Sequence, residues 1–159
     1  MEYPKYKIEV SKPSEIYEFV SVGIKGEIYK VVKFLPTDNP LLFNLALGDK
    51  TEVRILDNGE IDVLMDDTVK SENGERDMVL ATVASIVDSY TAAYPEKWIL
   101  FAGNTEIKTR LYRMAITKNY IELNKDFHIF GLICVNENFI RVPFDSKTNF
   151  LAFIIKRKI

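Results

Sequence analysis

The sequence predicts an α+β fold, in which a mostly antiparallel sheet carries two helices packed on one face. Short apolar segments separated by turn residues occupy both ends of the chain, as in antiparallel sheets. Between them lie two segments with apolar residues three and four positions apart, a spacing typical of amphipathic helices. The expected order is roughly five strands, a helix, a strand, a helix and three strands (β5-α-β-α-β3). A more closed, barrel-like sheet wrapped on the first helix is the alternative.

Length and composition indicate a single domain over residues 1–159. The apolar share is 47% and the charged share 28%, near the averages of soluble domains, and a chain of this length can bury a sizeable core. The one cysteine, Cys134, excludes an intramolecular disulfide, and its apolar neighbours predict that it is buried. A signal-peptide pattern and an apolar run of roughly 18 residues are both missing, so we expect a cytoplasmic protein without a membrane span.

Charge is distributed unevenly along the chain, whose net charge is −2. Residues 49–88 contain eleven acidic and four basic side chains, whereas residues 97–118 contain five basic side chains and one acidic. The net charge argues against general nucleic-acid binding. An anionic partner would find its more favourable field at the basic segment.

The N-terminal part of the chain predicts strands joined by short turns. Gly48 and Asp49 are expected to close the fourth strand. Asn58 and Gly59 are typical of a type I′ turn, because both central positions of that turn need positive φ angles. The predicted strands are residues 6–10, 16–22, 27–35 and 41–47, and the turn at Asn58 and Gly59 can join two further short segments, 53–56 and 61–64.

The first helix is predicted to begin after a cap at Ser71 or Asn73 and to end at Pro95. A fully apolar strand over residues 98–102 follows, and we expect it to lie centrally in the sheet with both faces covered. The apolar stripe of the helix comprises Val79, Val83, Ile86, Val87, Tyr90 and Tyr94.

The second helix is predicted to follow the turn at Gly103, with Asn104 or Thr105 as its N-cap and Asn119 as its stop. Three strands after it are expected to form a meander, with a turn at residues 136–138. These strands are predicted at residues 127–135, 139–142 and 150–155.

The start of this second helix is the best candidate for a bound ligand. A helix that follows a buried strand points its free backbone N–H groups beyond the strand end, and Lys108 and Arg110 add positive charge there. One glycine is far from a phosphate-binding loop, which needs several at fixed offsets. An ordinary capped helix is therefore the interpretation we favour over an anion site.

Arg110, Arg113 and Thr117 share one face of the second helix. Two guanidinium groups there can grip a carboxylate or a phosphate, or they can form internal salt bridges. We favour the salt bridges, which contribute little when exposed, about 0–1 kcal/mol. Their candidate partners are the carboxylates Asp66, Asp67 and Glu72.

The remaining titratable groups match no catalytic template. Arg76 opens the first helix and Asp49 follows the fourth strand, so these charges meet only if the two turns lie on one edge of the sheet. His128 is the only histidine, and strand alternation places it opposite Phe127 and Ile129. A two-histidine metal site is impossible within one chain. The sequence predicts no catalytic residue, no metal site and no cofactor.

Four segments carry a resemblance to a known family. They are NLALGD at residues 44–49, NGERD leading into VLATV at 73–83, FAGNT leading to TRLY at 101–112, and IKRK at 155–158. With them the chain resembles a family of small bacterial proteins of unknown function, common in Bacteroidota, over most of its length from about Tyr17 onward. The resemblance implies a cytosolic one-domain protein and brings no activity, cofactor or catalytic residue with it.

Together these observations predict a non-catalytic binding or interaction module that forms a homodimer. The alternative is an enzyme or sensor of a small anionic ligand bound where the central strand turns into the second helix. A nucleic-acid role ranks third, and salt-dependent binding is its minimum requirement. The predicted ligand-binding residues are Gly103, Asn104, Thr105, Lys108, Arg110, Arg113 and Arg76.

Overall fold

The computed structural model describes residues 4–11, 15–58, 61–66 and 76–159. The architecture is α+β with a mostly antiparallel sheet, as predicted, and the described chain contains three helices in place of the two expected. Hydrogen bonds link the strands in the order β1-β2-β3-β4-β6-β9-β7-β8, and β5 pairs with β4.

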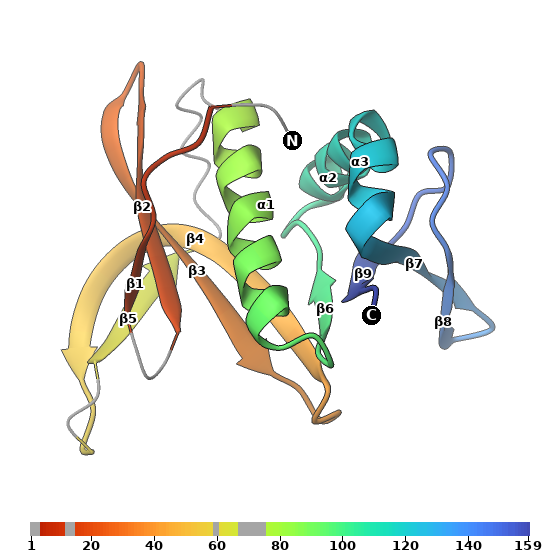
Figure 1. The fold of residues 1–159 in the computed structure, drawn as a ribbon, viewed down its shortest axis with the longest axis horizontal. Helices are drawn as coiled ribbons and strands as arrows, with labels where there is room; N and C mark the ends of the chain where they lie inside the picture. Colours follow the sequence, from red (N-terminus) through yellow and green to blue (C-terminus); the bar gives the residue numbers. More distant parts are fainter. Residues whose placement is uncertain (1–3, 12–14, 59–60, 67–75) are drawn as a thin grey trace. The chain divides into compact units, whose positions relative to one another are not determined.

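Contacts between residues divide the chain into two compact units. The N-terminal unit contains residues 2–35 and 45–88, and the C-terminal unit contains residues 36–44 and 89–159. The strand β4 and the helix α1 each pass from one unit into the other (Figure 1), and so does β3 with its last residue, Pro36. The single domain expected over residues 1–159 stays a prediction.

The N-terminal unit is built on antiparallel strands. β1 pairs with β2, β2 with β3, and β4 with β5. Gly26 has a φ of 83°, which suits glycine and closes the β2–β3 hairpin opposite Gly23. Ile16 and Val31 form its buried cluster, with Met65 against them. The strands are β1 (Glu9–Ser11), β2 (Ile16–Gly23), β3 (Gly26–Pro36), β4 (Leu42–Ile55) and β5 (Ile61–Asp66).

The predicted stop at Gly48 and Asp49 is wrong, because β4 continues through both residues to Ile55. Gly48 is buried, and the carboxylate of Asp49 forms an ion pair with Lys30 of β3. The pairing of β4 with β5 contains an irregularity, a register shift between Lys50 and Glu52. A glycine that marks a turn in sequence therefore lies inside a long strand here.

Helix α1 (Arg76–Ala93) confirms much of the predicted apolar stripe. Ile86, Val87 and Tyr90 are buried, whereas Val79 and Val83 are half-buried. Thr82 is buried too, and its hydroxyl accepts a 2.9 Å hydrogen bond from the backbone N–H of Tyr6. The caps predicted at Ser71 and Asn73 lie outside the described residues.

The C-terminal unit carries the remaining strands and helices. β6 runs parallel to the start of β4 and antiparallel to β9, so its predicted central position is confirmed. The elements are β6 (Trp98–Phe101), α2 (Glu106–Lys118), α3 (Tyr120–Asp126), β7 (Phe127–Val135), β8 (Asn138–Pro143) and β9 (Ala152–Arg157).

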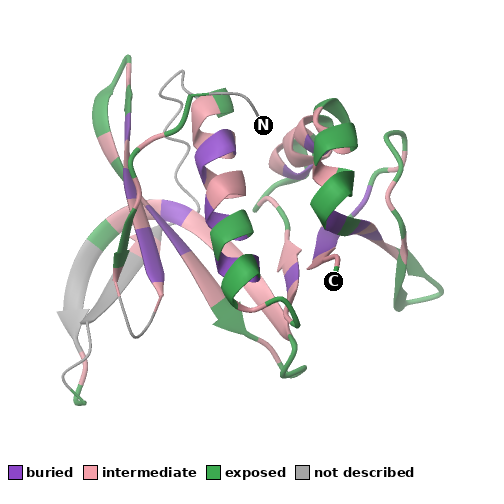
Figure 2. Cartoon of the chain, viewed as in Figure 1, coloured by how far each residue is buried: buried purple, intermediate pink, exposed green. Residues whose placement is uncertain are grey.

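The last three strands do not form the predicted meander. β9 pairs with β6 on one side and β7 on the other, which leaves β8 at the end of the order. Burial explains this arrangement: Phe153, Ile154 and Ile155 are consecutive and all buried, as in a strand covered on both faces. The residues of β8 are largely exposed, which suits an edge (Figure 2).

Helix α3 was not predicted. Asn119 does end α2, because its backbone N–H and its side chain both bond to the last turn, but α3 begins at the next residue. Seven residues give too few turns for an apolar repeat to show.

The two faces of this part of the sheet differ. Ile99, Ile155 and Ile129 lie side by side on three strands and are all buried, and the Tyr112 ring of α2 contacts Phe101 on the same face. The alternate positions form the opposite face, which carries His128, as the strand alternation predicts, and His128 is exposed there. None of the helices described here has the length and apolarity that a membrane span requires.

Candidate functional site

The predicted ligand site at the start of α2 is a tightly folded turn. Thr105 is the N-cap, and its hydroxyl accepts a 3.1 Å hydrogen bond from the backbone N–H of Lys108. The hydroxyl of Thr109 accepts a 3.0 Å hydrogen bond from the Gly103 N–H and lies 3.1 Å from the Thr105 carbonyl oxygen. The turn therefore satisfies these backbone groups from within.

Glycine is needed at position 103 because the chain approaches it closely. A Cβ atom there would lie 2.3 Å from the Cβ of Lys108 and 2.6 Å from the backbone nitrogen of Thr109. The structure thus brings Gly103, Thr105 and Lys108 together, and the helix cap and the tight turn explain why they are close. Asn104 is exposed beside them.

The predicted arginines have different surroundings. Arg113 donates hydrogen bonds to the carbonyl oxygen of Thr148, at 2.8 Å, and to Oδ1 of Asn149, at 2.5 Å. Arg110 is exposed on α2, and Arg76 is exposed at the start of α1 in the N-terminal unit. Of the partners proposed from sequence, Asp67 and Glu72 and the side chain of Asp66 lie outside the described residues.

The hydrogen bonds of Arg113 hold the loop that leads into β9 against α2. Hydrogen bonds from the Thr148 hydroxyl and from the N–H groups of Lys147 and Thr148, with the charge of Arg113, lower the pKa of Asp145 below its ordinary value. The only other shifted pKa among the described groups is that of Tyr112, which burial raises. The Asp145 shift follows from local hydrogen bonds and the Tyr112 shift from burial, and ligand binding at the start of α2 stays a prediction.

The β7–β8 hairpin has a different character, because it ends the unit with an open backbone edge. Its turn residues Asn136 and Glu137 have φ angles of 50° and 67°, as a type I′ turn requires. Val135 lies opposite Asn138 across this turn, and such a closing pair exchanges both backbone hydrogen bonds. Bonded and non-bonded pairs then alternate along the hairpin.

That alternation decides which backbone groups of β8 are open. The pairs Ile133–Ile140 and Gly131–Val142 are bonded, so the N–H and C=O groups of Phe139 and Arg141 point away from β7. Two contacts agree with this phase. The N–H of Phe144 donates to the carbonyl oxygen of Ile129, at a position where the alternation places a bonded pair. The carbonyl oxygen of Leu132, which lies opposite Arg141, accepts from the N–H of Leu151 on the side of β7 away from β8, as a non-bonded pair requires.

No strand of the described residues pairs with this outer side of β8 (Figure 1). Apolar side chains surround it. Phe139 is 73% exposed, and Ile140 and Val135 are 41% and 42% exposed. Cys134, opposite Phe139, is exposed as well, so its predicted burial is wrong. The apolar run around Cys134 forms the tip of a hairpin, where the helices do not cover it.

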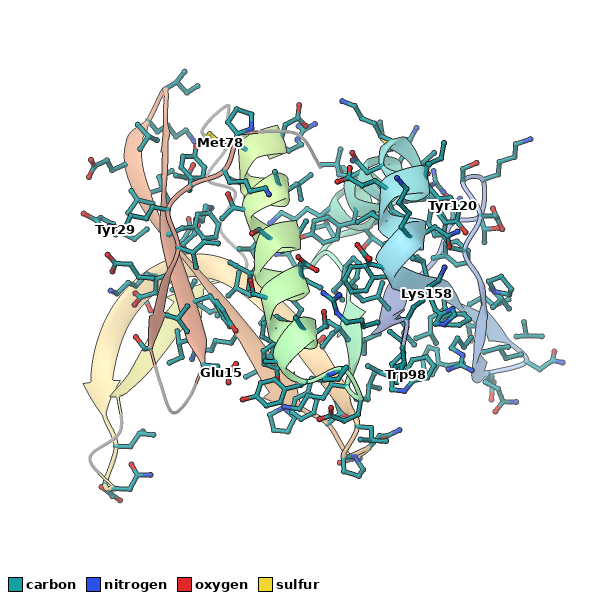
Figure 3. The ribbon with its side chains drawn as sticks, viewed as in Figure 1. Glu15, Tyr29, Met78, Trp98, Tyr120 and Lys158 are labelled. Carbon is teal, nitrogen blue, oxygen red and sulfur yellow. The ribbon has the colours of Figure 1, made fainter. Side chains whose placement is uncertain are left out.

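Arg141 is the one charged residue of β8, and its exposed side chain lies over aromatic rings of the neighbouring sheet face. Its guanidinium lies 4.6 Å from the ring centre of Trp98 and 4.6 Å from that of Phe130. Figure 3 shows Trp98 between β6 and the hairpin. Charged side chains often protect sheet edges against pairing with another chain. Here the charge lies on two aromatic rings, which leaves the edge backbone open.

Sequence reasoning placed this hairpin correctly and missed its exposure. The turn at residues 136–138 was predicted, and β7 has the predicted bounds. However, an apolar strand at a sheet edge and an apolar strand in a sheet centre have the same sequence pattern. The usable signal was the pair of hairpin residues Arg141 and Pro143, because charge and proline are both typical of edge strands.

The structure is that of a small α+β protein whose strand order ends at β8. Among the described residues, no group of three or more His, Cys, Asp or Glu side chains is placed to hold a metal ion. The chain belongs to a family of unknown function, DUF6934, whose model matches residues 2–158. The expected membership of an uncharacterised family is thereby confirmed. No curated protein and no solved structure matches the chain.

Proposed function

We propose that the protein is a non-catalytic interaction module that forms a homodimer through the outer edge of β8. One observation carries this proposal. The N–H and C=O groups of Phe139 and Arg141 point outward between exposed apolar side chains, while the only charge of the strand is held on Trp98 and Phe130. An edge of this kind pairs readily with an extended segment of another chain.

A second copy of the chain is the partner that suits this edge. A two-fold axis brings two identical β8 strands together antiparallel, so each open edge covers the other. Backbone groups that point outward from one protomer then meet complementary groups of its partner. The pair uses the β8 edge of both protomers, so this edge takes no third chain.

The strength of the dimer can be bounded from the groups involved. Each new backbone hydrogen bond contributes about 0.5–1.5 kcal/mol net, and full burial of a side chain such as Phe139 contributes about 1.5–3 kcal/mol. Association costs about 4–15 kcal/mol in lost translational and rotational freedom. These gains exceed the cost only toward the favourable end of the ranges, so we expect a weak dimer whose population depends on protein concentration.

Sedimentation equilibrium tests the proposal directly. We expect the wild-type mass to rise from monomer toward dimer between about 1 and 100 µM, a range that corresponds to association free energies of about −8 to −5.5 kcal/mol. Phe139→Lys places a charge beside the edge and should keep the chain monomeric. Ile121→Lys is the matched control, because Ile121 is an equally apolar residue, 84% exposed, that belongs to α3 and not to β8.

Two results would overturn the proposal. One is a wild-type protein that stays monomeric over the whole range. The other is a dimer that Phe139→Lys and Ile121→Lys weaken equally. Circular dichroism of both variants establishes that each is folded, so a loss of mass can be assigned to the surface.

A further inference from the structure

We infer that the two-fold axis of the dimer passes between Ile140 of one protomer and Ile140 of its partner, so that Phe139 of each pairs with Arg141 of the other. This inference rests on the proposed function. It follows from three properties of β8: which backbone groups are open, where the hairpin turn before it lies, and where its proline lies.

The alternation of outward and inward backbone groups along β8 limits the registers in which two β8 strands can pair. Only Phe139 and Arg141 present both N–H and C=O outward within β8, because Pro143 lacks an N–H. In an antiparallel pair about a two-fold axis, the outward residues of one strand must meet outward residues of the other. The axis can therefore lie at Phe139, at Ile140 or at Arg141.

An axis at Arg141 is disfavoured by the proline. It sets Phe139 opposite the partner's Pro143, which cannot donate the hydrogen bond that the pair requires. The carbonyl oxygen of Phe139 then stays unpaired in both protomers.

An axis at Phe139 shortens the ladder. Phe139 then meets the partner's Phe139 in one bonded pair, and Arg141 falls opposite the partner's Glu137. Glu137 has a φ of 67° in the hairpin turn, so it is not extended and cannot continue the ladder. Only one bonded pair remains.

An axis at Ile140 uses the outward N–H and C=O groups of both Phe139 and Arg141. Two bonded pairs form, Phe139 with the partner's Arg141 and the reverse, and each exchanges two hydrogen bonds. Ile140 faces the partner's Ile140 in the close, non-bonded position between them, where the Cα atoms approach to about 4.5 Å. The Phe139 ring packs on the stem of the partner's Arg141, whose guanidinium stays over Trp98 and Phe130.

Disulfide trapping distinguishes these registers. In a Cys134→Ser background, which removes the exposed native thiol, single cysteines are placed at positions 139, 140, 141 and 142 and oxidised with oxidised glutathione. Cross-linked dimer is measured by non-reducing electrophoresis. Ile140→Cys should cross-link, because disulfides need Cα atoms about 4.4–6.8 Å apart.

Val142→Cys is the matched control, because Val142 points to the same face of the strand as Ile140. With the axis at Ile140, it lies four residues from the partner's Val142, roughly 13 Å along the strand, beyond the reach of a disulfide. We expect Ile140→Cys to cross-link at least about tenfold faster than Val142→Cys.

The outcomes separate this inference from the proposed function. Faster cross-linking at position 139 or 141 than at 140, in a protein that still dimerises, overturns the register and keeps the edge as the contact. Dimerisation without a cross-link at any of the four positions overturns both the register and the β8 edge. A background protein that is monomeric by sedimentation overturns the homodimer itself.

Discussion

The guanidinium of Arg141 lies 4.6 Å from the ring centre of Trp98, although the strands that carry them, β8 and β6, are separated by β7 and β9. Phe130 on β7 provides a second ring at the same distance. This contact connects the fold with the proposed function. It stabilises the face of the sheet and keeps a positive charge away from the edge that we propose as the dimer contact.

Replacing Arg141 separates these two effects. Arg141→Met keeps an apolar stem over the rings, so we expect the dimer to persist with a loss of fold stability of about 0.5–1 kcal/mol from the missing cation–π contact. Arg141→Glu is repelled by the ring faces and should turn outward to the edge, which abolishes the dimer. Urea unfolding and sedimentation of both variants provide the two readouts. Equal self-association in Arg141→Glu and wild type would contradict the role given to this residue.

Gly103 should be intolerant of any side chain. Gly103→Ala brings a Cβ to 2.3 Å from Lys108 Cβ and 2.6 Å from the Thr109 nitrogen, and the backbone atom cannot move without opening the turn. We expect a loss of about 1–3 kcal/mol in the free energy of unfolding, the range for overpacked sites. Arg110→Ala, an exposed change on the same helix, should stay within about 0.5 kcal/mol of wild type. Denaturant titration checks both, and a Gly103→Ala protein as stable as wild type would show that the turn can relax.

The Asp145 carboxylate predicts a pH-dependent contribution to stability. Its pKa is lower in the folded protein than the ordinary value of 3.8. A group of this kind stabilises the fold above its unfolded-state pKa, and that stabilisation is lost as the pH falls through the folded-state pKa. Asp145→Asn should therefore melt below wild type at pH 7, and the gap should narrow below about pH 4. A gap that is constant from pH 7 to pH 3 would contradict this, as measured by thermal melts in matched buffers.

Lys97 is held by aromatic rings at the end of α1. Its Nζ lies 4.1 Å from the ring centre of Phe43 and 4.0 Å from that of Tyr94, and donates a 2.9 Å hydrogen bond to the Tyr90 hydroxyl. Lys97→Met keeps the packing and loses the charge, so we expect a loss of about 1–2 kcal/mol. Lys125→Met, an exposed change on α3, is the control. If chemical unfolding gives the same free energy of unfolding for both variants, the cluster contributes only through packing.

The periodic parts of the chain could be predicted from sequence, because their signals are local. The stripe of α1, the buried strand at Trp98 and the Thr105 cap each follow from spacing or from a single residue type. Strand neighbours could not be predicted, since they depend on which apolar strand has both faces covered. The burial of Phe153 and Ile155 places β9 centrally, and nothing in the order of the chain shows this.

The candidate site was harder to predict, for a related reason. Gly103 and the basic residues of α2 stand out in sequence because glycine and arginine are rare enough to notice. Phe139 and Ile140 resemble core residues, and only the structure shows that no described strand or helix covers them. The contact between Arg141 and Trp98 joins residues 43 positions apart. No local pattern predicts it.

Residue-resolved hydrogen exchange at two protein concentrations tests the central claim most directly. Dimerisation through β8 buries the outward N–H groups of Phe139 and Arg141, so their exchange should slow as the concentration rises, in step with the fraction of dimer. The turn N–H groups of Asn136 and Glu137 should exchange at the same rate throughout. If Phe139 and Arg141 exchange equally fast at every concentration while the protein sediments as a dimer, the contact lies elsewhere and the account is wrong.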